Sequence, residues 1–431
     1  MSVVDGHVTG IGGSATSGHV WLSFASASLA WMFDAMDLTI FMLVLVPSVS
    51  ELIGSTDPAS VAHAGGVILA CKLLAWGLGG VAFGVVADRA GRAKTMMVTV
   101  LIYSVFTGLS GLAQSWWQLI GLQALAGIGI GGEWAAGAAL VAETWPERSR
   151  QRALVAMQMS FAAGFFLAGL LNVVVGPIGW RWVLAAGAAP AVLALPLRWF
   201  VPEPERWLAV RRRERASAAD ASLSGARFLM QIWAPDLRRR TVVGVTTAAA
   251  LMIGAWGTTT LLPTWIVQLA GRDGGTRAIT ATGQCFMLAN LGAILGYLVV
   301  MWLNDAIGRR WTYALVVLGC IASALFTFTQ IRTIAALMWV MPLYGFFAIG
   351  GFATIAAYLP ELFPTRIRAT GQGFCWNTAR ALTALGPLGS GVLVAGLGSV
   401  PAAAALLTAS YAIGLVAIWF GPETRDVPLT D

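Results

Sequence analysis

Charged residues are scarce in this sequence, and so are the residue types that usually build disulfide scaffolds or metal sites. Of the 431 residues, 11% are charged, against about 25% in typical soluble domains. The four cysteines lie inside apolar stretches without Cys-x-x-Cys spacing, so we interpret them as small packed side chains. These shortages exclude a soluble globular protein, a disulfide scaffold and a disordered chain.

Signatures of enzymes are also missing. No Gly-x-x-x-x-Gly-Lys-Ser/Thr loop is present to bind nucleotide phosphates. The three histidines, His7, His19 and His63, lie near or outside the ends of the apolar stretches and form no ligand set with the cysteines. We therefore expect no enzymatic activity, no metal, no cofactor and no drive by ATP.

Long apolar runs, in contrast, fill most of the chain. Apolar residues make up 58% of the sequence, and the mean hydropathy is +0.76. A helix needs about 20 mainly apolar residues to cross a bilayer. We predict an all-α membrane protein with twelve transmembrane helices. The twelve runs lie at 19–47, 62–87, 94–114, 116–143, 152–176, 180–200, 241–269, 277–303, 311–330, 333–360, 368–395 and 398–420.

One polar segment divides these runs six and six. It spans 201–240 and includes the arginine clusters at 211–213 and 238–240, which is typical of a solvated linker. The predicted organisation is a tail at 1–18, a six-helix bundle at 19–200, the linker at 201–240, a second six-helix bundle at 241–420 and a tail at 421–431.

The net charge of +7 is explained by the orientation of the chain in a membrane. Cytoplasmic loops carry an excess of Lys and Arg. If the N-terminus is cytoplasmic, 21 of the 27 basic residues fall in cytoplasmic segments. We therefore predict that both termini are cytoplasmic and that the protein lies in a bacterial inner membrane. The lipid bilayer is its partner, and we expect no nucleic-acid binding.

Two motifs occur twice. Residues 84–92 read G-V-V-A-D-R-A-G-R, and residues 304–310 repeat part of this as N-D-A-I-G-R-R. Residues 143–150 read E-T-W-P-E-R-S-R, and residues 361–368 read E-L-F-P-T-R-I-R. The offsets are 217 and 218 residues, so a six-helix unit is duplicated with the same orientation in both halves. Parallel repeats of this kind occur in secondary transporters.

These motifs resemble the signature loops of the major facilitator superfamily. Residues 127–134 (G-I-G-I-G-G-E-W), 377–387 (N-T-A-R-A-L-T-A-L-G-P) and the F-D-A-M-D of the first run resemble its sialate/lactate-type and aromatic-acid proton symporters. The resemblance implies two pseudo-symmetric six-helix bundles, alternating access and a functional monomer. Residues 254–260 read G-A-W-G-T-T-T where sugar porters carry a Gln-Gln pair, which counts against a sugar substrate.

Five ionisable residues fall near the middle of apolar runs, where a charge costs several kcal/mol. Asp34 and Asp37 are spaced i, i+3 and share one helical face. Glu133 lies in a glycine-rich stretch that allows close helix packing. Carboxylates crowded in a low dielectric cannot all ionise cheaply, so we predict that these three acids couple transport to protons. The alternatives are a structural pairing of Asp34 or Asp37 with Lys72, and a helix–helix hydrogen bond of Glu133.

The other two ionisable residues are cations. Arg380 cannot lose its proton and needs an anion at this depth, yet the second half offers no acid in mid-membrane. We expect it to bind a substrate carboxylate with its planar fork, the alternative being a salt bridge between the halves. Lys72 either binds a second anionic group or neutralises Asp34 or Asp37. If Lys72 is tied to Asp37, a monoanionic substrate is favoured; if it is free, a dianion.

Further polar and aromatic residues are candidates for the substrate cavity, although each alone is more often a packing residue. They are Gln123, Trp134, Trp256, Thr259, Asn290, Tyr358 and Asn377.

The repeated loop motifs suggest a conformational gate on the cytoplasmic side, made of acids and arginines that part when the halves move. The alternative is that they serve only solvation and topology. The gate residues are Asp88, Arg89, Arg92, Glu143, Arg150, Asp305, Arg309, Glu361 and Arg368.

The sequence therefore predicts a proton-coupled symporter of a small organic anion, either a mono- or dicarboxylate or an aromatic acid. A cation or drug:proton antiporter could use the same acids, but Arg380 and Lys72 argue against it. A sugar or polyol symporter is weakened by residues 254–260. A non-transporting receptor on the same fold is the remaining alternative.

Overall fold

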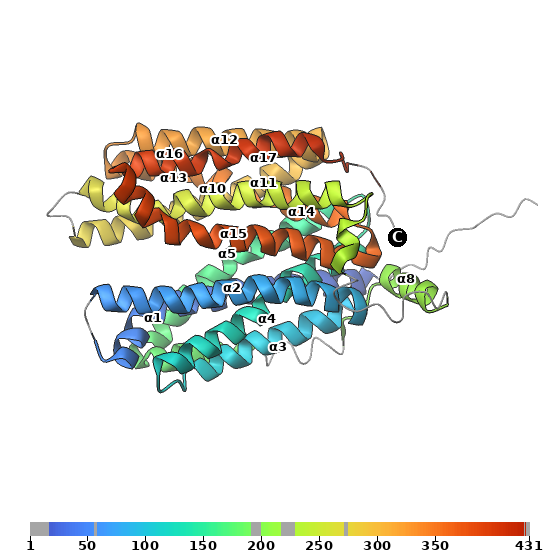
Figure 1. Cartoon of the computed structure of the whole chain (residues 1–431), viewed down its shortest axis with the longest axis horizontal. Helices are drawn as coiled ribbons and strands as arrows, with labels where there is room; N and C mark the ends of the chain where they lie inside the picture. Colours follow the sequence, from blue (N-terminus) through green and yellow to red (C-terminus); the bar gives the residue numbers. More distant parts are fainter. Residues whose placement is uncertain are drawn as a thin grey trace, which may run out of the picture.

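The computed structural model describes residues 17–55, 58–190, 200–216, 229–270, 275–425 and 427. Throughout these residues the regular structure is helical, with no strand. A chain in a bilayer must satisfy its backbone hydrogen bonds internally, and helices do so within each segment. Most helices run along the long axis of the molecule, side by side (Figure 1).

The first half of the chain forms one group of helices. α1, α4 and α5 pack together, α2 and α3 pack on α4, and α6 closes the group against α3 and α1. The helices are α1 (Ser17–Ile53), α2 (Pro58–Ala90), α3 (Arg92–Ser110), α4 (Trp116–Thr144), α5 (Arg150–Val175) and α6 (Trp180–Ala186).

The second half forms a matching group in which α10 packs on α15 and α17, and α11 packs on α13. Two of the predicted apolar runs are interrupted. The run at 333–360 is broken between α13 and α14 at residues 349–351, and the run at 398–420 is broken between α16 and α17 at Ala409. The helices are α10 (Arg238–Ala270), α11 (Gly275–Ile307), α12 (Arg309–Thr329), α13 (Ile334–Ala348), α14 (Phe352–Leu362), α15 (Arg368–Leu397), α16 (Val400–Thr408) and α17 (Ser410–Ala417).

Ten stretches of the described chain are long and apolar enough to cross a membrane. The two predicted runs that are not among them are 180–200 and 368–395. The first is partly outside the described residues, since the structure describes α6 but not 191–199. The second is α15, in which residues 384–392 lie outside the part of the chain searched for spans. The prediction of an all-helical membrane fold is confirmed, and the ten spans are consistent with the twelve predicted transmembrane helices.

The polar segment between the halves contains a helix of its own. α8 (Glu205–Ala216) and a short 3₁₀ turn (Gln231–Trp233) lie within the predicted linker, and α10 begins at Arg238, before the predicted 241. The linker residues 217–228, like the tails at 1–16 and 428–431, lie outside the described residues. The division into two bundles with these boundaries therefore stays a prediction.

The two groups meet along α2 and α15 and along the contacts of α5 with α11 and α14 (Figure 1). α2 and α15 can approach closely because α2 has glycines on the contact face. A methyl group at Gly84 would lie 2.8 Å from the carbonyl oxygen of Ala369, and one at Gly80 would collide with the side chain of Asn377. This contact brings Arg380 of α15 beside the buried charges of the first half.

Candidate functional site

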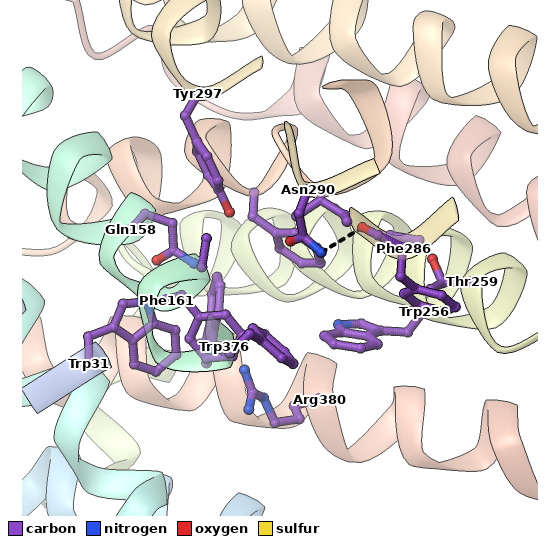
Figure 2. Close-up of a pocket in the computed structure, with 15 residues that line it drawn as sticks. Trp31, Gln158, Phe161, Trp256, Thr259, Phe286, Asn290, Tyr297, Trp376 and Arg380 are labelled. Carbon is purple, nitrogen blue, oxygen red and sulfur yellow. Dashed lines mark hydrogen bonds between the residues drawn. The ribbon is translucent and has the colours of Figure 1, made fainter. Parts of the chain in front are cut away.

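A cavity of about 220 Å³ lies between the two groups of helices. Its walls come from α1 and α5 of the first half and from α10, α11, α14 and α15 of the second half. Aromatic rings dominate the lining (Figure 2). The lining residues are Trp31, Gln158, Phe161, Ala162, Phe165, Ala255, Trp256, Thr259, Phe286, Asn290, Tyr297, Ile349, Phe352, Trp376 and Arg380.

Arg380 supplies the positive charge of this cavity. Its guanidinium lies 3.8 Å from the ring centre of Trp76 and 5.7 Å from that of Trp376, which are cation–π distances. Within the described part of the chain it has no hydrogen bond and no ion pair. Its N–H groups are therefore available to a ligand, and Figure 2 shows the side chain at the edge of the aromatic wall.

The wall beside Arg380 is a set of packed aromatic rings from both halves. Trp376 of α15 stacks on Trp134 of α4 with centroids 4.1 Å apart and planes at 15°. Trp31 of α1 contacts Phe161 of α5 at 4.7 Å, and Phe352 of α14 meets Trp376 edge-on at 6.1 Å. Such rings form flat, rigid surfaces that suit a planar apolar ligand.

Polar groups lie on the other side of the cavity. Gln158, Tyr297, Asn290 and Thr259 line it (Figure 2). The Asn290 amide donates to the carbonyl oxygen of Phe286 at 2.9 Å, and the Gln158 carbonyl oxygen accepts from the Trp134 indole at 3.2 Å. The cavity thus has a cationic end, an aromatic middle and a hydrogen-bonding end.

Asp34 and Glu133 form a buried pair of acids behind the aromatic wall. Both are fully buried, and none of their four carboxyl oxygens has a hydrogen-bond partner in the described structure. Glu133 and Asp34 interact directly, and Arg380 of the other half attracts Asp34. An ionised carboxylate without donors is costly in such a site, so this pair is suited to bind and release protons.

Asp37 has different surroundings, although it is only one turn from Asp34. Its carboxylate accepts from Lys72 Nζ at 2.8 Å and from the hydroxyl of Thr107. Lys72 also donates to Gln123 at 2.9 Å, and Gln123 donates to Ser110. Between the two roles predicted for Lys72, the geometry favours neutralisation of Asp37. Asp37 is accordingly less suited to carry protons than Asp34.

Glu143 lies near the C-terminal end of α4 and accepts hydrogen bonds from arginines of both halves. Arg92 donates to it at 2.9 and 3.2 Å, and Arg368 of α15 donates at 2.7 Å. Asp88 pairs with Arg92 at 2.8 Å and accepts the backbone N–H of Thr370 at 2.7 Å. Asp88 therefore binds the N-terminal turn of α15, where the helix dipole favours an anion. We call these residues the Glu143 junction.

The repeated motif builds a second junction around Glu361. Arg309 donates to Glu361 at 2.9 and 3.1 Å, as Arg92 does to Glu143. Arg150 of the first half reaches Glu361 at 3.4 Å, and Asp305 pairs with Arg152 at 2.7 Å. Each half thus lends an arginine to the acid of the other. We call these residues the Glu361 junction.

Two glutamates that the sequence analysis did not single out complete the junctions. Glu203 accepts the backbone N–H of Arg92 at 2.7 Å, and Glu423 accepts those of Arg309 and Arg310 at 3.0 and 3.1 Å. Glu203 caps α3, which begins after Gly91, and Glu423 caps α12, which begins after Gly308. Both glycines belong to the repeated motif and have positive φ. Burial raises the pKa of Glu423, but the backbone donors outweigh it and hold that pKa below its ordinary value.

Comparison with known proteins agrees with this architecture. The family model of the Major Facilitator Superfamily matches residues 27–382. The chain belongs to the major facilitator superfamily. It is 30% identical over 94% of its length to a probable 4-methylmuconolactone transporter of Cupriavidus pinatubonensis, of which 91% is covered. It is 28% identical over 96% of its length to the cis,cis-muconate transport protein of Acinetobacter baylyi, of which 98% is covered.

A solved structure of the same superfamily has the same fold. The proton:xylose symporter XylE, bound to 6-bromo-6-deoxy-D-glucose, matches with a TM-score of 0.74 over 95% of this chain and 97% of that chain, at 18% identity. Membership of the superfamily makes this protein a transmembrane transporter rather than an enzyme. The family resemblance predicted from the loop motifs is confirmed.

The structure brings only some of the predicted cavity residues to the cavity of this transporter. Arg380, Trp256, Thr259 and Asn290 line it, and Trp134 packs directly behind Trp376.

Three other candidates lie elsewhere. Gln123 binds Lys72, and Asn377 donates to the carbonyl of Gly373 within α15. The hydroxyl of Tyr358 donates to the carbonyl of Pro422, beside the Glu361 junction. Because polar residues in apolar helices serve helix packing as well as ligand binding, the sequence could not separate these uses.

Most of the aromatic lining was missed. Trp31, Phe161, Phe286, Tyr297 and Trp376 lie in apolar runs where an aromatic residue is usual. Only the packing of the helices shows which of these rings face the cavity. Of the predicted gate residues, Arg89 lies in the last turn of α2, next to Asp88, and the others make the two junctions described above.

Proposed function

We propose that this protein is a proton-coupled symporter that carries a small organic anion across a bacterial inner membrane, as a monomer with both termini in the cytoplasm. The observation that carries the proposal is the position of Arg380. It is a permanent cation at the interface of the halves, inside an aromatic cavity, without an ion-pair partner among the described residues. A carboxylate of the substrate is the anion that such a guanidinium binds best.

The lining of the cavity favours a flat, unsaturated or aromatic carboxylate. Trp376, Phe161 and Trp256 supply faces and edges for a planar body, and Gln158 and Asn290 supply hydrogen-bonding groups at the other end. The two relatives named for 4-methylmuconolactone and cis,cis-muconate support the same chemical class. The cavity volume of about 220 Å³ suits a molecule the size of a substituted benzoate.

The pairing of the buried cations favours a substrate with a single negative charge. Lys72 is held by Asp37 and Gln123 at 2.8 and 2.9 Å, so its charge is already balanced. Arg380 is then the cation left for the substrate among the described mid-membrane residues. A second carboxylate would have to be buried against neutral side chains, which is costly.

Charge balance explains how a proton follows the anion. In the empty carrier, Arg380 balances one negative charge shared by Asp34 and Glu133, with one proton on the pair. A bound substrate carboxylate forms an ion pair with Arg380, so the negative charge on Asp34 and Glu133 is no longer balanced by a cation. The ionised one of these two acids then binds a proton, because an uncompensated buried charge is unfavourable. One proton enters with each monoanion, and the loaded cavity is neutral.

The two junctions provide the gate in this proposal. They hold the halves together on the cytoplasmic side while the cavity loads from outside. Opening to the cytoplasm breaks the bonds of Arg368 to Glu143 and of Arg150 to Glu361, which join the halves. A neutral cavity permits this movement, whereas a cavity with an unbalanced charge resists it.

Uptake into proteoliposomes tests the proposal. The probes are radiolabelled gallate and 4-hydroxybenzoate as aromatic monoanions, cis,cis-muconate as a dianion, xylose as a neutral sugar and tetraethylammonium as a cation. We expect an inward proton gradient to stimulate uptake of a monoanion above the level in protein-free liposomes, which report passive diffusion of the acid. Gradient-driven uptake or exchange of the cation or the sugar, without that of any anion, would contradict the proposal.

A further inference from the structure

A second pocket, separate from the substrate cavity, lies at the Glu361 junction. It has a volume of about 310 Å³. Its wall is rich in arginine from both halves of the chain: Arg148 lies just before α5, Arg150 and Arg152 lie in the first turn of α5, and Arg309 and Arg425 come from the second half. The proposed transport function uses the contact of Arg150 with Glu361 as part of the gate but assigns no ligand to this pocket.

Arg150 is the unusual residue of this wall. It is 4% exposed, yet its contact with Glu361 is a single one at 3.4 Å. Its Nε and Nη1 atoms are buried and have no hydrogen-bond partner in the described structure. Buried donors are normally satisfied, and leaving them unpaired is costly. The guanidinium therefore has two N–H positions that lack an acceptor, and the side chain forms part of the pocket wall.

The related residue in the other half shows that this is a local feature. Arg368 occupies the equivalent position of the repeated motif and is fully buried. Its Nη1 donates to Glu143 at 2.7 Å and its Nε donates to the carbonyl of Pro360 at 3.1 Å. At the Glu143 junction the protein itself supplies acceptors for Arg368. At the Glu361 junction two N–H positions of Arg150 have no acceptor in the described structure, and its side chain lines a pocket.

The acids around the pocket are already engaged. Glu147 pairs with Arg206 at 2.5 Å, Asp305 pairs with Arg152 at 2.7 Å, and Glu361 is held by Arg309 at 2.9 Å. Arg148 is exposed and has no ion pair among the described residues. The pocket thus keeps an excess of positive charge from Arg148 and Arg150.

We propose that this pocket binds a phosphate-class oxyanion, held by the free N–H groups of Arg150 and by Arg148. Tetrahedral oxyanions suit the arginine fork, and the backbone N–H groups in the first turn of α5 favour negative charge at the same place. The pocket has walls from both halves, so an anion bound there would stabilise the conformation in which this side is closed. The same chemistry is offered by free phosphate and by the headgroup of an anionic phospholipid.

Thermal unfolding of the purified protein in neutral detergent tests for binding of free phosphate. Inorganic phosphate replaces chloride at constant ionic strength, so that screening does not change. We expect phosphate to raise the unfolding midpoint of the wild type by about 2 °C. Arg150→Gln should lose this shift. Arg332→Gln, an exposed arginine at the opposite end of the molecule, should keep it.

A second arm distinguishes a lipid from a free anion. The same proteins are placed in nanodiscs of phosphatidylcholine with and without phosphatidylglycerol, and lipids that stay bound are counted by native mass spectrometry. If the lipid is the source, the wild type and Arg332→Gln retain more phosphatidylglycerol than Arg150→Gln does. If Arg150→Gln fails to fold, Arg148→Gln should weaken the same shift or retention. Equal responses of the wild type and both pocket variants, or no response to either phosphate source, would overturn the proposal.

Discussion

The two cations within the apolar helices of this transporter lie on α2 and α15, which pack against each other, but their surroundings differ. Lys72 donates to Asp37 and Gln123 at 2.8 and 2.9 Å within its own half. Arg380 contacts the rings of Trp76 and Trp376 and, among the described residues, has no acceptor. Lys72 therefore has acceptors supplied by the protein, whereas Arg380 has none among the described residues.

This difference indicates a structural role for Lys72 and a binding role for Arg380. A satisfied buried ion pair fixes the packing of neighbouring helices, and its removal leaves an uncompensated charge. A cation within an apolar helix that has no ion-pair partner is expensive to retain, which is typical of a binding site. The acids divide in the same way, since Asp37 is hydrogen-bonded and Asp34 and Glu133 are not.

Replacing the unpaired cation should give the largest loss of transport. Arg380→Lys keeps the charge but removes the planar fork and its stacking on Trp76. We expect the rate of monoanion uptake to fall about 100-fold, which corresponds to loss of one charge-assisted bidentate contact. Initial rates in proteoliposomes measure this, with the amount of folded protein checked by size-exclusion chromatography. Uptake at the wild-type rate would show that Arg380 does not hold the anion.

Neutralising an unpaired acid should cause a smaller loss that is specific to proton-driven accumulation. Asp34→Asn and Glu133→Gln remove the groups that receive the proton. We expect accumulation against a gradient to fall about 10-fold, while exchange of internal for external substrate continues. The comparison of driven uptake with exchange in the same vesicles measures this effect. Equal loss of both activities would assign these acids a structural role.

Breaking the satisfied pair should affect stability more than substrate affinity. Lys72→Gln leaves Asp37 buried without its cation. We therefore expect the free energy of unfolding to fall by about 3 kcal/mol, which lowers the unfolding midpoint. The double variant Lys72→Gln, Asp37→Asn removes both charges and should recover part of this loss. Substrate affinity should change less than about threefold in the double variant. A large loss of affinity there would assign Lys72 to the substrate.

The smallest effect is expected at the two junctions, where it should be unequal. Arg368 makes two strong hydrogen bonds, whereas Arg150 makes one contact at 3.4 Å. Arg368→Gln should therefore lower the unfolding midpoint more than Arg150→Gln does in phosphate-free detergent. Differential scanning fluorimetry of both variants checks the order. The reverse order would show that the Glu361 junction carries more of the contact between the halves.

The charged parts of the site could be predicted from the sequence. Arg380, Asp34 and Lys72 interrupt apolar runs, and an ionisable group there is conspicuous because a membrane core does not solvate it. The gate residues were predicted because the motifs recur at nearly the same offset, and the ion pairs that join the halves, Arg368 with Glu143 and Arg150 with Glu361, follow that symmetry.

The remaining features depend on packing. The packing of α5, α11 and α14 decides which aromatic rings line the cavity, and the sequence of these largely apolar helices does not mark those rings. Gln123 and Asn377 are polar but serve helix contacts, which only the neighbouring helix reveals. The caps by Glu203 and Glu423 join residues more than 100 positions apart. No local pattern marks such pairs.

The most direct test of the proposed coupling is the number of protons that enter with each anion. Proteoliposomes that contain a pH-sensitive dye are given labelled gallate, and the dye signal and the label are recorded together, with Arg380→Lys vesicles as the background. Charge balance at Arg380 predicts one proton for each gallate and no dependence of the initial rate on membrane potential at a fixed proton gradient. Gallate uptake without proton entry above that background would contradict it.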